Sequence, residues 1–268
     1  MPTNPQLSPA TYDRIRRLVY AEVGIELGPS KQSLVEARLA KRLRELSLPT
    51  YEAYLDQIER GGGDDELVLL LDAISTNVTS FFRERQGLDE IAARHAAAVR
   101  GGQKRLRYWS AASSSGQEAY SLAMLLAEAA PLPGLDVAIL GTDISTKVLE
   151  LARRGRYPTS QLPSIPSALH RHLHGDGELF EIDPALRSLC VFNRMNLIKP
   201  PFPMKGPFDA VLCRNVMIYF DQPTRERLVG EIHRLLKPGG LLVTGQAESL
   251  TGRSGGFRVV KPSIYEKA

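Results

Sequence analysis

The segment WSAASSSGQEAYS, residues 109–121, joins an apolar run to a helix-like pattern through a turn of small residues. The run from Arg105 to Ala111 is typical of a buried strand, and apolar side chains at helical spacing follow from Ala119 onward. A strand, a short loop and a helix in this order begin a nucleotide-binding α/β domain. The loop has one glycine instead of the Gly-x-Gly-x-x-Gly pattern that wraps a pyrophosphate, and Glu118 puts a negative charge where a phosphate would lie. The segment therefore predicts an α/β fold whose ligand carries no pyrophosphate.

Residues 104–268 alternate short apolar runs with helix-like patterns. The runs are rich in β-branched residues, as in LDVAILGTD (135–143), FDAVLCRN (208–215) and GLLVTGQA (240–247). Strands that alternate with helices predict a mostly parallel sheet covered on both faces. The last segment, GFRVVKPSIYEKA (256–268), predicts a hairpin at the edge of that sheet.

One stretch departs from this alternation and predicts an insertion at about 157–195. The segments HGDGELFEID (174–183) and ALRSLCVFNRMNL (185–197) are typical of two short antiparallel strands rather than of another strand–helix–strand unit. We therefore expect a small antiparallel β-subdomain beside the main sheet.

The first part of the chain has helical periodicity and almost no strand signal. Ser8 followed by Pro9 predicts the start of one helix, and Thr50 predicts the start of another. Further helices are expected at about 30–46 and, after three glycines, from Asp64 onward. The predicted organisation is a helical N-terminal domain (1–85), a helical connector (86–103) and an α/β domain (104–268).

The composition is that of a globular protein with a mild excess of positive charge. The 268 residues are 43% hydrophobic and 24% charged, with a net charge of +4 and a pI of about 9.1. This charge is compatible with an acidic partner but too small to indicate nucleic acid. Cys190 and Cys213 lack metal-site spacing, which favours buried, reduced thiols. With no apolar run of leader or membrane-span length, we expect a cytoplasmic protein without a metal ion or membrane insertion.

Ligands of parallel α/β sheets lie beyond the carboxyl ends of the strands, where this sequence has two carboxylates. Asp143 ends the second strand and is suited to accept the hydroxyl groups of a ribose, although an aspartate there also caps helices. Glu118, in the first turn of a helix, favours the helix dipole or accepts a ligand ammonium group. A nucleoside with an α-amino acid in place of phosphates satisfies both carboxylates, and S-adenosylmethionine is such a molecule.

The segment STNVTSFFRER, residues 75–85, is a second unusual stretch. It places the polar residues Asn77, Thr79 and Arg83 around two adjacent phenylalanines. A helix junction explains it equally well, with the phenylalanines packed between domains and the arginine in solvent.

Six strings in order resemble the CheR family of chemotaxis methyltransferases. Besides residues 109–124 they are TNVTSFFRE (76–84), GTDIS (141–145), NLIKPPFP (196–203), FDAVLCRNVMIYFD (208–221) and LLKPGGLLVTGQAESL (235–250). The resemblance covers nearly the whole chain. It implies a class I, Rossmann-like S-adenosylmethionine methyltransferase domain with a small antiparallel β-subdomain, preceded by an all-α N-terminal domain. It also implies transfer of a methyl group to receptor glutamates, leaving S-adenosylhomocysteine.

The resemblance also implies which residues bind the cofactor. They are Asn77, Thr79, Arg83, Glu118, Asp143, Asn196, Leu197, Asn215 and Val216. The chain departs from the family pattern at Val78, where glutamate is frequent, at Gln117, which replaces a glutamate, and at Ala119, which replaces a proline. GQAES (245–249) stands in place of Gly-His-Ser-Glu-Ser. None of these departures removes a cofactor residue, but Gln117 leaves one carboxylate fewer near the cofactor.

The implied reaction needs no general base, because a glutamate with a pKa near 4.3 is already an anionic nucleophile at neutral pH. Tyr219, four residues after Asn215, is a candidate for orienting the substrate carboxylate; packing beside Phe220 explains it as well. A non-catalytic module that binds S-adenosylmethionine and signals through the helical domain is an alternative. A nucleic-acid methyltransferase is disfavoured, because Asn215-Val216 is unlike the Asn-Pro-Pro-Tyr-type motif that grips a base amine.

The expected partner is the cytoplasmic helical bundle of a methyl-accepting chemotaxis receptor, approached by a monomer recruited to receptor arrays. Arg38 and Arg42 share one helical face with Lys41 and are the candidate receptor contacts, although a solvated face explains them too. The insertion around HGDGELFEIDPAL (174–186) is shorter than in members that bind a receptor's C-terminal pentapeptide. We therefore expect recognition that is independent of such a tether.

Overall fold

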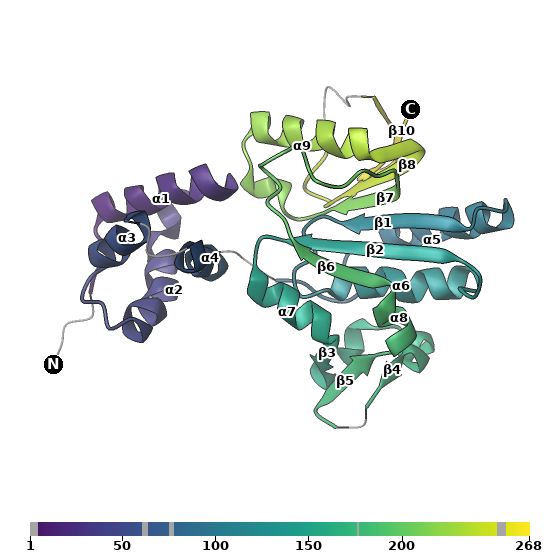
Figure 1. The fold of residues 1–268 in the computed structure, drawn as a ribbon, viewed down its shortest axis with the longest axis horizontal. Coiled ribbons are helices and arrows are strands. Elements are labelled where there is room, and N and C mark those ends of the chain that lie inside the picture. The colour runs from purple at the N-terminus through teal and green to yellow at the C-terminus, as the bar shows by residue number, and fades with distance from the viewer. Residues whose placement is uncertain (1–4, 61–63, 75–77, 176, 251–255) are drawn as a thin grey trace.

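The computed structural model describes residues 5–60, 64–74, 78–175, 177–250 and 256–268, which form a helical domain beside a larger α/β domain (Figure 1). The helical domain holds α1 (Pro9–Val23), α2 (Gln32–Glu45), α3 (Tyr51–Glu59) and α4 (Asp64–Ile74), with the short 3-10 helix η1 (Pro29–Lys31) before α2. None of the helices in the described ranges is long and apolar enough to span a membrane.

The predicted helix starts at Pro9 and after Thr50 are confirmed. The Ser8 hydroxyl accepts a hydrogen bond from the Thr11 N–H at 3.2 Å, and the Thr50 hydroxyl accepts one from the Ala53 N–H at 3.1 Å. These caps satisfy N–H groups that the first turn of a helix leaves without partners. The four helices then bury one apolar face each around a common core.

The α/β domain is built on a seven-stranded sheet in the order β6-β2-β1-β7-β8-β10-β9. Its parallel strands are β1 (Arg105–Ser110), β2 (Asp136–Asp143), β6 (Cys190–Arg194), β7 (Phe208–Cys213) and β8 (Leu236–Thr244). The predicted hairpin is confirmed as β9 (Phe257–Lys261) and β10 (Ile264–Lys267), which adds to β8 in antiparallel fashion at one edge.

Helices cover both faces of this sheet, as the alternation predicted. Side chains of one strand alternate between the faces, so Tyr108 lies on the side of α5 (Gln86–Arg100) and α6 (Gln117–Ala129), while Trp109 lies on the side of α9 (Gln222–Leu235). The residues expected to form a connector are largely α5, which buries Leu88 and Ile91 in the core of the α/β domain. Helix α7 (Thr146–Arg154) packs against β2 and β6.

The insertion forms a three-stranded antiparallel sheet in the order β3-β5-β4, with β3 at Arg156–Pro158, β4 at Leu173–His174 and β5 at Leu179–Ile182. The 3-10 helices η2 (Thr159–Ser164) and η3 (Ser167–His172) connect β3 to β4. The expectation of a second antiparallel strand within 185–197 was wrong. That stretch holds the short helix α8 (Pro184–Ser188) and then β6, which pairs in parallel with β2 at the edge of the main sheet.

The two domains meet where the end of α1 and the loop after it lie against loops of the α/β domain. The Asn196 amide donates to the carbonyl of Glu22 at 2.6 Å, and Lys199 forms an ion pair with the Glu22 carboxylate at 3.0 Å. The backbone N–H of Glu26 donates to the carbonyl of Tyr219 at 3.0 Å, and the Tyr20 hydroxyl donates to Asp221. The loop after α1 is thereby held over the carboxyl end of the sheet.

We expect Gly116→Ala to destabilise the protein more than Gly134→Ala. Both glycines have a positive φ, 93° and 84°, so each substitution costs about 1–2 kcal/mol of backbone strain. A Cβ at 116 would also lie 2.9 Å from the Ala152 Cβ and 3.1 Å from the Tyr157 hydroxyl, whereas a Cβ at 134 meets nothing within 4 Å. The extra cost of overpacking is about 1–3 kcal/mol. Urea unfolding followed by the fluorescence of Trp109, the single tryptophan, measures the difference; equal losses would show that the loop tolerates a methyl group.

Candidate functional site

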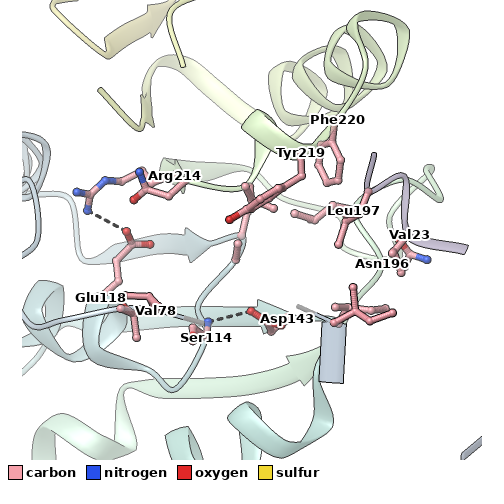
Figure 2. A pocket seen from close by; sticks show the side chains of 18 of the residues that line it. Val23, Val78, Ser114, Glu118, Asp143, Asn196, Leu197, Arg214, Tyr219 and Phe220 are labelled. Carbon is pink, nitrogen blue, oxygen red and sulfur yellow. Dashed lines mark hydrogen bonds and ion pairs between the residues drawn. The ribbon is translucent and has the colours of Figure 1, made fainter. Parts of the chain in front are cut away.

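A cavity of about 300 Å³ opens at the carboxyl ends of β1, β2, β6 and β7. The residues that follow these four strands form its floor and walls, and Figure 2 shows their side chains converging on it. The helical domain supplies the remaining side through the end of α1, the loop after it and α2, with Val23, Ile25, Leu27 and Arg38. The segment after α4 contributes Thr79 and Arg83.

Glu118 projects from the first turn of α6 at one end of the cavity. Its Oε1 accepts a hydrogen bond from the Ser110 hydroxyl at 2.6 Å, and its Oε2 pairs with the Arg214 guanidinium at 2.9 Å (Figure 2). A carboxylate has about four acceptor positions, so lone pairs remain for a ligand. Glu118 is thus fixed in place by its neighbours and can still accept hydrogen bonds from an ammonium group.

Arg214 was not assigned a role from the sequence, yet it connects two sides of the cavity. Its side chain is 3% exposed and forms a second ion pair with Glu84, at 3.2 Å. It also donates to the backbone carbonyls of Arg83 and Glu84. One buried cation therefore joins the end of β7 to Glu118 and to the segment that carries Thr79 and Arg83.

Glu84 is the second carboxylate of this network, and its residue type and position gave no signal of that role. Burial acts to raise its pKa, but hydrogen bonds from Asn215 and Arg214 outweigh burial, and the pKa lies below the ordinary value. The Asn215 amide donates to Glu84 at 3.3 Å. Glu84 therefore stays ionised at neutral pH and provides the second negative charge that pairs with Arg214.

Asp143 ends β2 on the opposite side of the cavity from Arg214 (Figure 2). Its two oxygens accept backbone N–H groups of Ser114 at 2.9 Å and Ser145 at 3.0 Å. The N-cap of α7 is Ser145, whose hydroxyl accepts from the Val148 N–H, so Asp143 is not the helix cap. Burial raises the pKa of Asp143 despite these donors, and the charge of Asp72 on α4 adds to the rise.

The loop after β7 places Asn215, Val216 and Tyr219 on the cavity wall. Asn215 adopts a left-handed backbone conformation with φ 58°, which turns the chain sharply after the strand. Figure 2 shows the Tyr219 ring extending into the cavity with its hydroxyl end toward Glu118, whereas Phe220 is buried in the core beside α9. Tyr219 therefore points into the cavity and is not only packed beside Phe220.

Asn196 and Leu197 follow β6 and line the same cavity. The Asn196 amide is occupied by the carbonyl of Glu22, and its Oδ1 accepts from the Ile198 N–H at 3.2 Å. In this structure Asn196 therefore fixes the C-terminal end of α1 in place, while Leu197 gives the wall an apolar surface.

In the segment after α4 the phenylalanines pack in the core and polar residues line the cavity. Each of the two explanations offered from the sequence therefore accounts for part of this segment. Phe81 and Phe82 are buried in the core of the α/β domain, and the N–H of Phe82 donates to the Ser121 hydroxyl at 3.0 Å. Thr79 and the exposed Arg83 line the cavity mouth, with the Arg83 guanidinium donating to the carbonyl of Val78 at 3.1 Å. Asn77, the remaining cofactor residue expected from the sequence, lies outside the described residues.

The two arginines predicted to contact a receptor lie in different surroundings. Arg38 lines the cavity and donates to the carbonyl of Ile74 at 2.6 Å, at the end of α4. Arg42 does not reach the cavity, because it pairs with Glu66 at 2.7 Å and with Glu45 within the helical domain. Tyr54 also donates to Glu66, which makes Arg42 part of the packing of that domain.

The residues present fit S-adenosylmethionine. Glu118 offers acceptors for an ammonium group, Asp143 offers acceptors for ribose hydroxyls, and the wall between them is mostly apolar (Ala111, Ile144, Leu197, Val216). Gly116, at the end of the loop after β1, packs tightly against Ala152 and Tyr157, and the described loop forms no nest of glycines around a pyrophosphate. No group of three or more His, Cys, Asp or Glu side chains suited to a metal ion occurs among the described residues.

Comparison with known proteins gives two matches that together span most of the chain. Residues 77–265 match the family described as CheR methyltransferase, SAM binding domain, and residues 10–75 match CheR methyltransferase, all-alpha domain. The chain is 38% identical over 265 residues to Chemotaxis protein methyltransferase 2 of Pseudomonas aeruginosa, covering 96% of this chain and 92% of that protein. It is 38% identical over 264 residues to Chemotaxis protein methyltransferase of Salmonella typhimurium, covering 97% and 90%.

Replacing the buried cation should be costly. We expect Arg214→Met to lower the free energy of unfolding by roughly 3–5 kcal/mol, because it leaves Glu84 and Glu118 without their cation. The control Arg234→Met removes a half-exposed partner of Glu231 and should cost less than about 1 kcal/mol. Urea unfolding of both variants measures the difference. A loss for Arg214→Met no larger than that of the control would show that the network adds nothing to stability.

Proposed function

The chain belongs to the CheR methyltransferase family and is an S-adenosylmethionine-dependent methyltransferase, and from this premise we propose that its substrates are glutamate side chains of chemotaxis receptors. The products are glutamate methyl esters and S-adenosylhomocysteine. The observation that carries this proposal is the placement of Glu118, Asp143 and Tyr219 around one cavity at the carboxyl end of the sheet. The enzymatic assignment also excludes a purely regulatory module.

S-adenosylmethionine supplies a methyl group on a positively charged sulfur. Glu118, held by Ser110 and Arg214, would bind its ammonium group, and Asp143 would accept the ribose hydroxyls. Thr79, Arg83, Asn196, Leu197, Asn215 and Val216 would complete the binding site, together with Asn77. The described members of this set line the same cavity, which supports the proposal.

The chain's own task is alignment. The substrate carboxylate oxygen forms a bond to the methyl carbon as the sulfur–carbon bond breaks, and no proton moves. Fixing the reacting groups in line contributes about 7–11 kcal/mol to lowering the barrier. We place the substrate carboxylate beside the Tyr219 hydroxyl, because that ring extends into the cavity. A hydroxyl donor orients a carboxylate without the tight ion pair that would stabilise the ground state as much as the transition state.

The partner we propose is the cytoplasmic helical bundle of a receptor, approached by a monomer recruited to receptor arrays. Arg38 and Arg42 on α2 remain the proposed contacts, with Arg38 the more informative because it lies at the cavity. Arg42 also holds Glu66, so its replacement would disturb the domain itself. Recognition independent of a C-terminal pentapeptide is supported by the small number of residues between β4, which ends at His174, and β5, which begins at Leu179.

The cofactor site is tested by Glu118→Gln. Loss of a charged hydrogen-bond partner costs about 1.5–3 kcal/mol, so S-adenosylhomocysteine should bind roughly 10- to 150-fold more weakly by calorimetry. Transfer of labelled methyl to receptor-containing membranes, giving a base-labile ester, should fall in parallel. The matched control is Glu128→Gln on the same helix, whose carboxylate pairs with Arg171 and His172 away from the cavity. Wild-type protein that binds no S-adenosylhomocysteine, or transfers no methyl group, would refute the proposal.

Receptor recognition is tested by methylation kinetics on receptors with and without their last five residues. We expect the receptor KM of the wild-type enzyme to be the same for both. Arg38→Gln keeps a hydrogen-bond donor but removes the charge, so the KM should rise several-fold at low salt and less at high salt. Arg100→Gln, at the exposed end of α5, is the control. This mode of recognition would be contradicted by a KM that rises when the receptor lacks its last five residues. A KM that is the same for Arg38→Gln as for the wild-type enzyme would also contradict it.

A further inference from the structure

A single carboxylate joins the loops that follow the neighbouring strands β7 and β8. Glu248, in the loop after β8, is 6% exposed and lies outside the set of residues that line the cavity. Its Oε2 accepts the backbone N–H groups of Asn215 at 2.7 Å and Gly245 at 2.8 Å. Its Oε1 accepts the N–H of Ile218 at 3.1 Å. Three buried or half-buried donors of two loops therefore share one acceptor group.

The donors from the β7 loop lie at the turn that shapes the cavity wall. Asn215 has a left-handed backbone conformation, and the chain then enters the 3-10 helix η4 (Met217–Tyr219). The carboxylate spans this turn, with one oxygen on the N–H of Asn215 and the other on that of Ile218. Because an unpaired buried N–H costs free energy, the carboxylate favours this turn over alternatives that point the two N–H groups elsewhere.

The contact is close enough to exclude any side chain at Gly245. A Cβ there would lie 2.6 Å from the Glu248 Oε2 and 3.0 Å from the backbone nitrogen of Asn215. Gly245 thus lets the two loops approach within hydrogen-bond distance of one carboxylate. Gly245 and Glu248 together hold the two loops in contact.

We propose that Glu248 is a positioning residue, which fixes the wall formed by Asn215, Val216 and Tyr219 by accepting the backbone N–H groups of Asn215 and Ile218. Glu248 does not line the cavity, so it acts only through the loop after β7. The inference extends the proposed function, since Val216 and Tyr219 matter for catalysis only if the cavity binds cofactor and substrate. The conformation of the loop itself does not depend on that function.

Glu248→Gln isolates this role because it keeps the size of the side chain. A glutamine has one acceptor oxygen, and its NH₂ group can only donate. With the oxygen toward Asn215 and Gly245, the NH₂ group faces the N–H of Ile218; turned around, it faces the other two. Either orientation loses at least one hydrogen bond and places two donors against each other.

The matched control is Glu231→Gln. Glu231 is also a largely buried carboxylate that accepts a backbone N–H, that of Phe202 at 2.8 Å, but it lies on α9 and does not line the cavity. Both variants remove a charged acceptor from a backbone donor. Only Glu248→Gln should change the cavity wall.

The experiment combines amide hydrogen exchange with binding in the full-length protein. In Glu248→Gln we expect the amides of Asn215 and Ile218 to exchange at least ten-fold faster. The Kd for S-adenosylhomocysteine should rise about ten-fold and kcat should fall at saturating cofactor, well below the melting temperature. In Glu231→Gln the exchange of these two amides and the Kd should stay at wild-type values, whatever its melting temperature.

Unchanged exchange of Asn215 and Ile218 in Glu248→Gln would overturn the inference, and so would faster exchange with wild-type affinity and kcat. Wild-type protein that binds no S-adenosylhomocysteine would refute the proposed function instead. Hydrogen exchange would still test whether Glu248 fixes the conformation of the loop after β7. Should Glu248→Gln fail to fold, Glu248→Asp gives the same readouts. It keeps the charge but shortens the side chain, so it should lose one of the two ends of the span and show the same changes to a smaller degree.

Discussion

The candidate site depends on one buried cation shared by two carboxylates. Arg214 holds Glu118 through Nη1 and Glu84 through Nη2, and Nη2 also donates to the backbone carbonyls of Arg83 and Glu84. A buried charge is costly unless it is paired and hydrogen-bonded, so the two carboxylates and the guanidinium fix one another. The ends of β1 and β7 and the segment after α4 are thereby held together. Glu118 keeps acceptor positions that Ser110 and Arg214 do not use, and an ammonium group can bind there.

Much of this arrangement follows from local sequence. The small residues after β1, the acidic end of β2 and the Asn215-Val216 pair after β7 sit where parallel strands end, and strand ends of one sheet meet at one edge. Helix starts at Pro9 and after Thr50 were predictable because caps are local hydrogen bonds. For residues whose types alone left alternatives open, the predicted roles came from the resemblance to the CheR family.

Other features were not predictable because they depend on partners far away in the chain. β6 looked like an antiparallel strand of the insertion, but its pairing is decided by β2, about fifty residues earlier, whose free edge accepts it in parallel. The helical face with Arg42 was expected to contact a receptor or solvent, but the Arg42 side chain pairs with Glu66 on another helix. Arg214 stands directly before Asn215, which was a usable signal. By contrast, nothing in the sequence around Val23 or Glu26 indicates that this loop covers a cavity of the other domain.

The position of the loop after α1 has a consequence for the synthesis and folding of the protein. Val23 and Tyr219 face the same cavity although they lie near opposite ends of the chain, and the Glu26 N–H meets the Tyr219 carbonyl directly. During synthesis the helical part leaves the ribosome long before the strands it must cover, so a complete binding chamber arises only after most of the chain has been made. A fragment that starts after α4 keeps the sheet but lacks one side of that chamber. Dissecting the chain into its two halves therefore also divides the chamber.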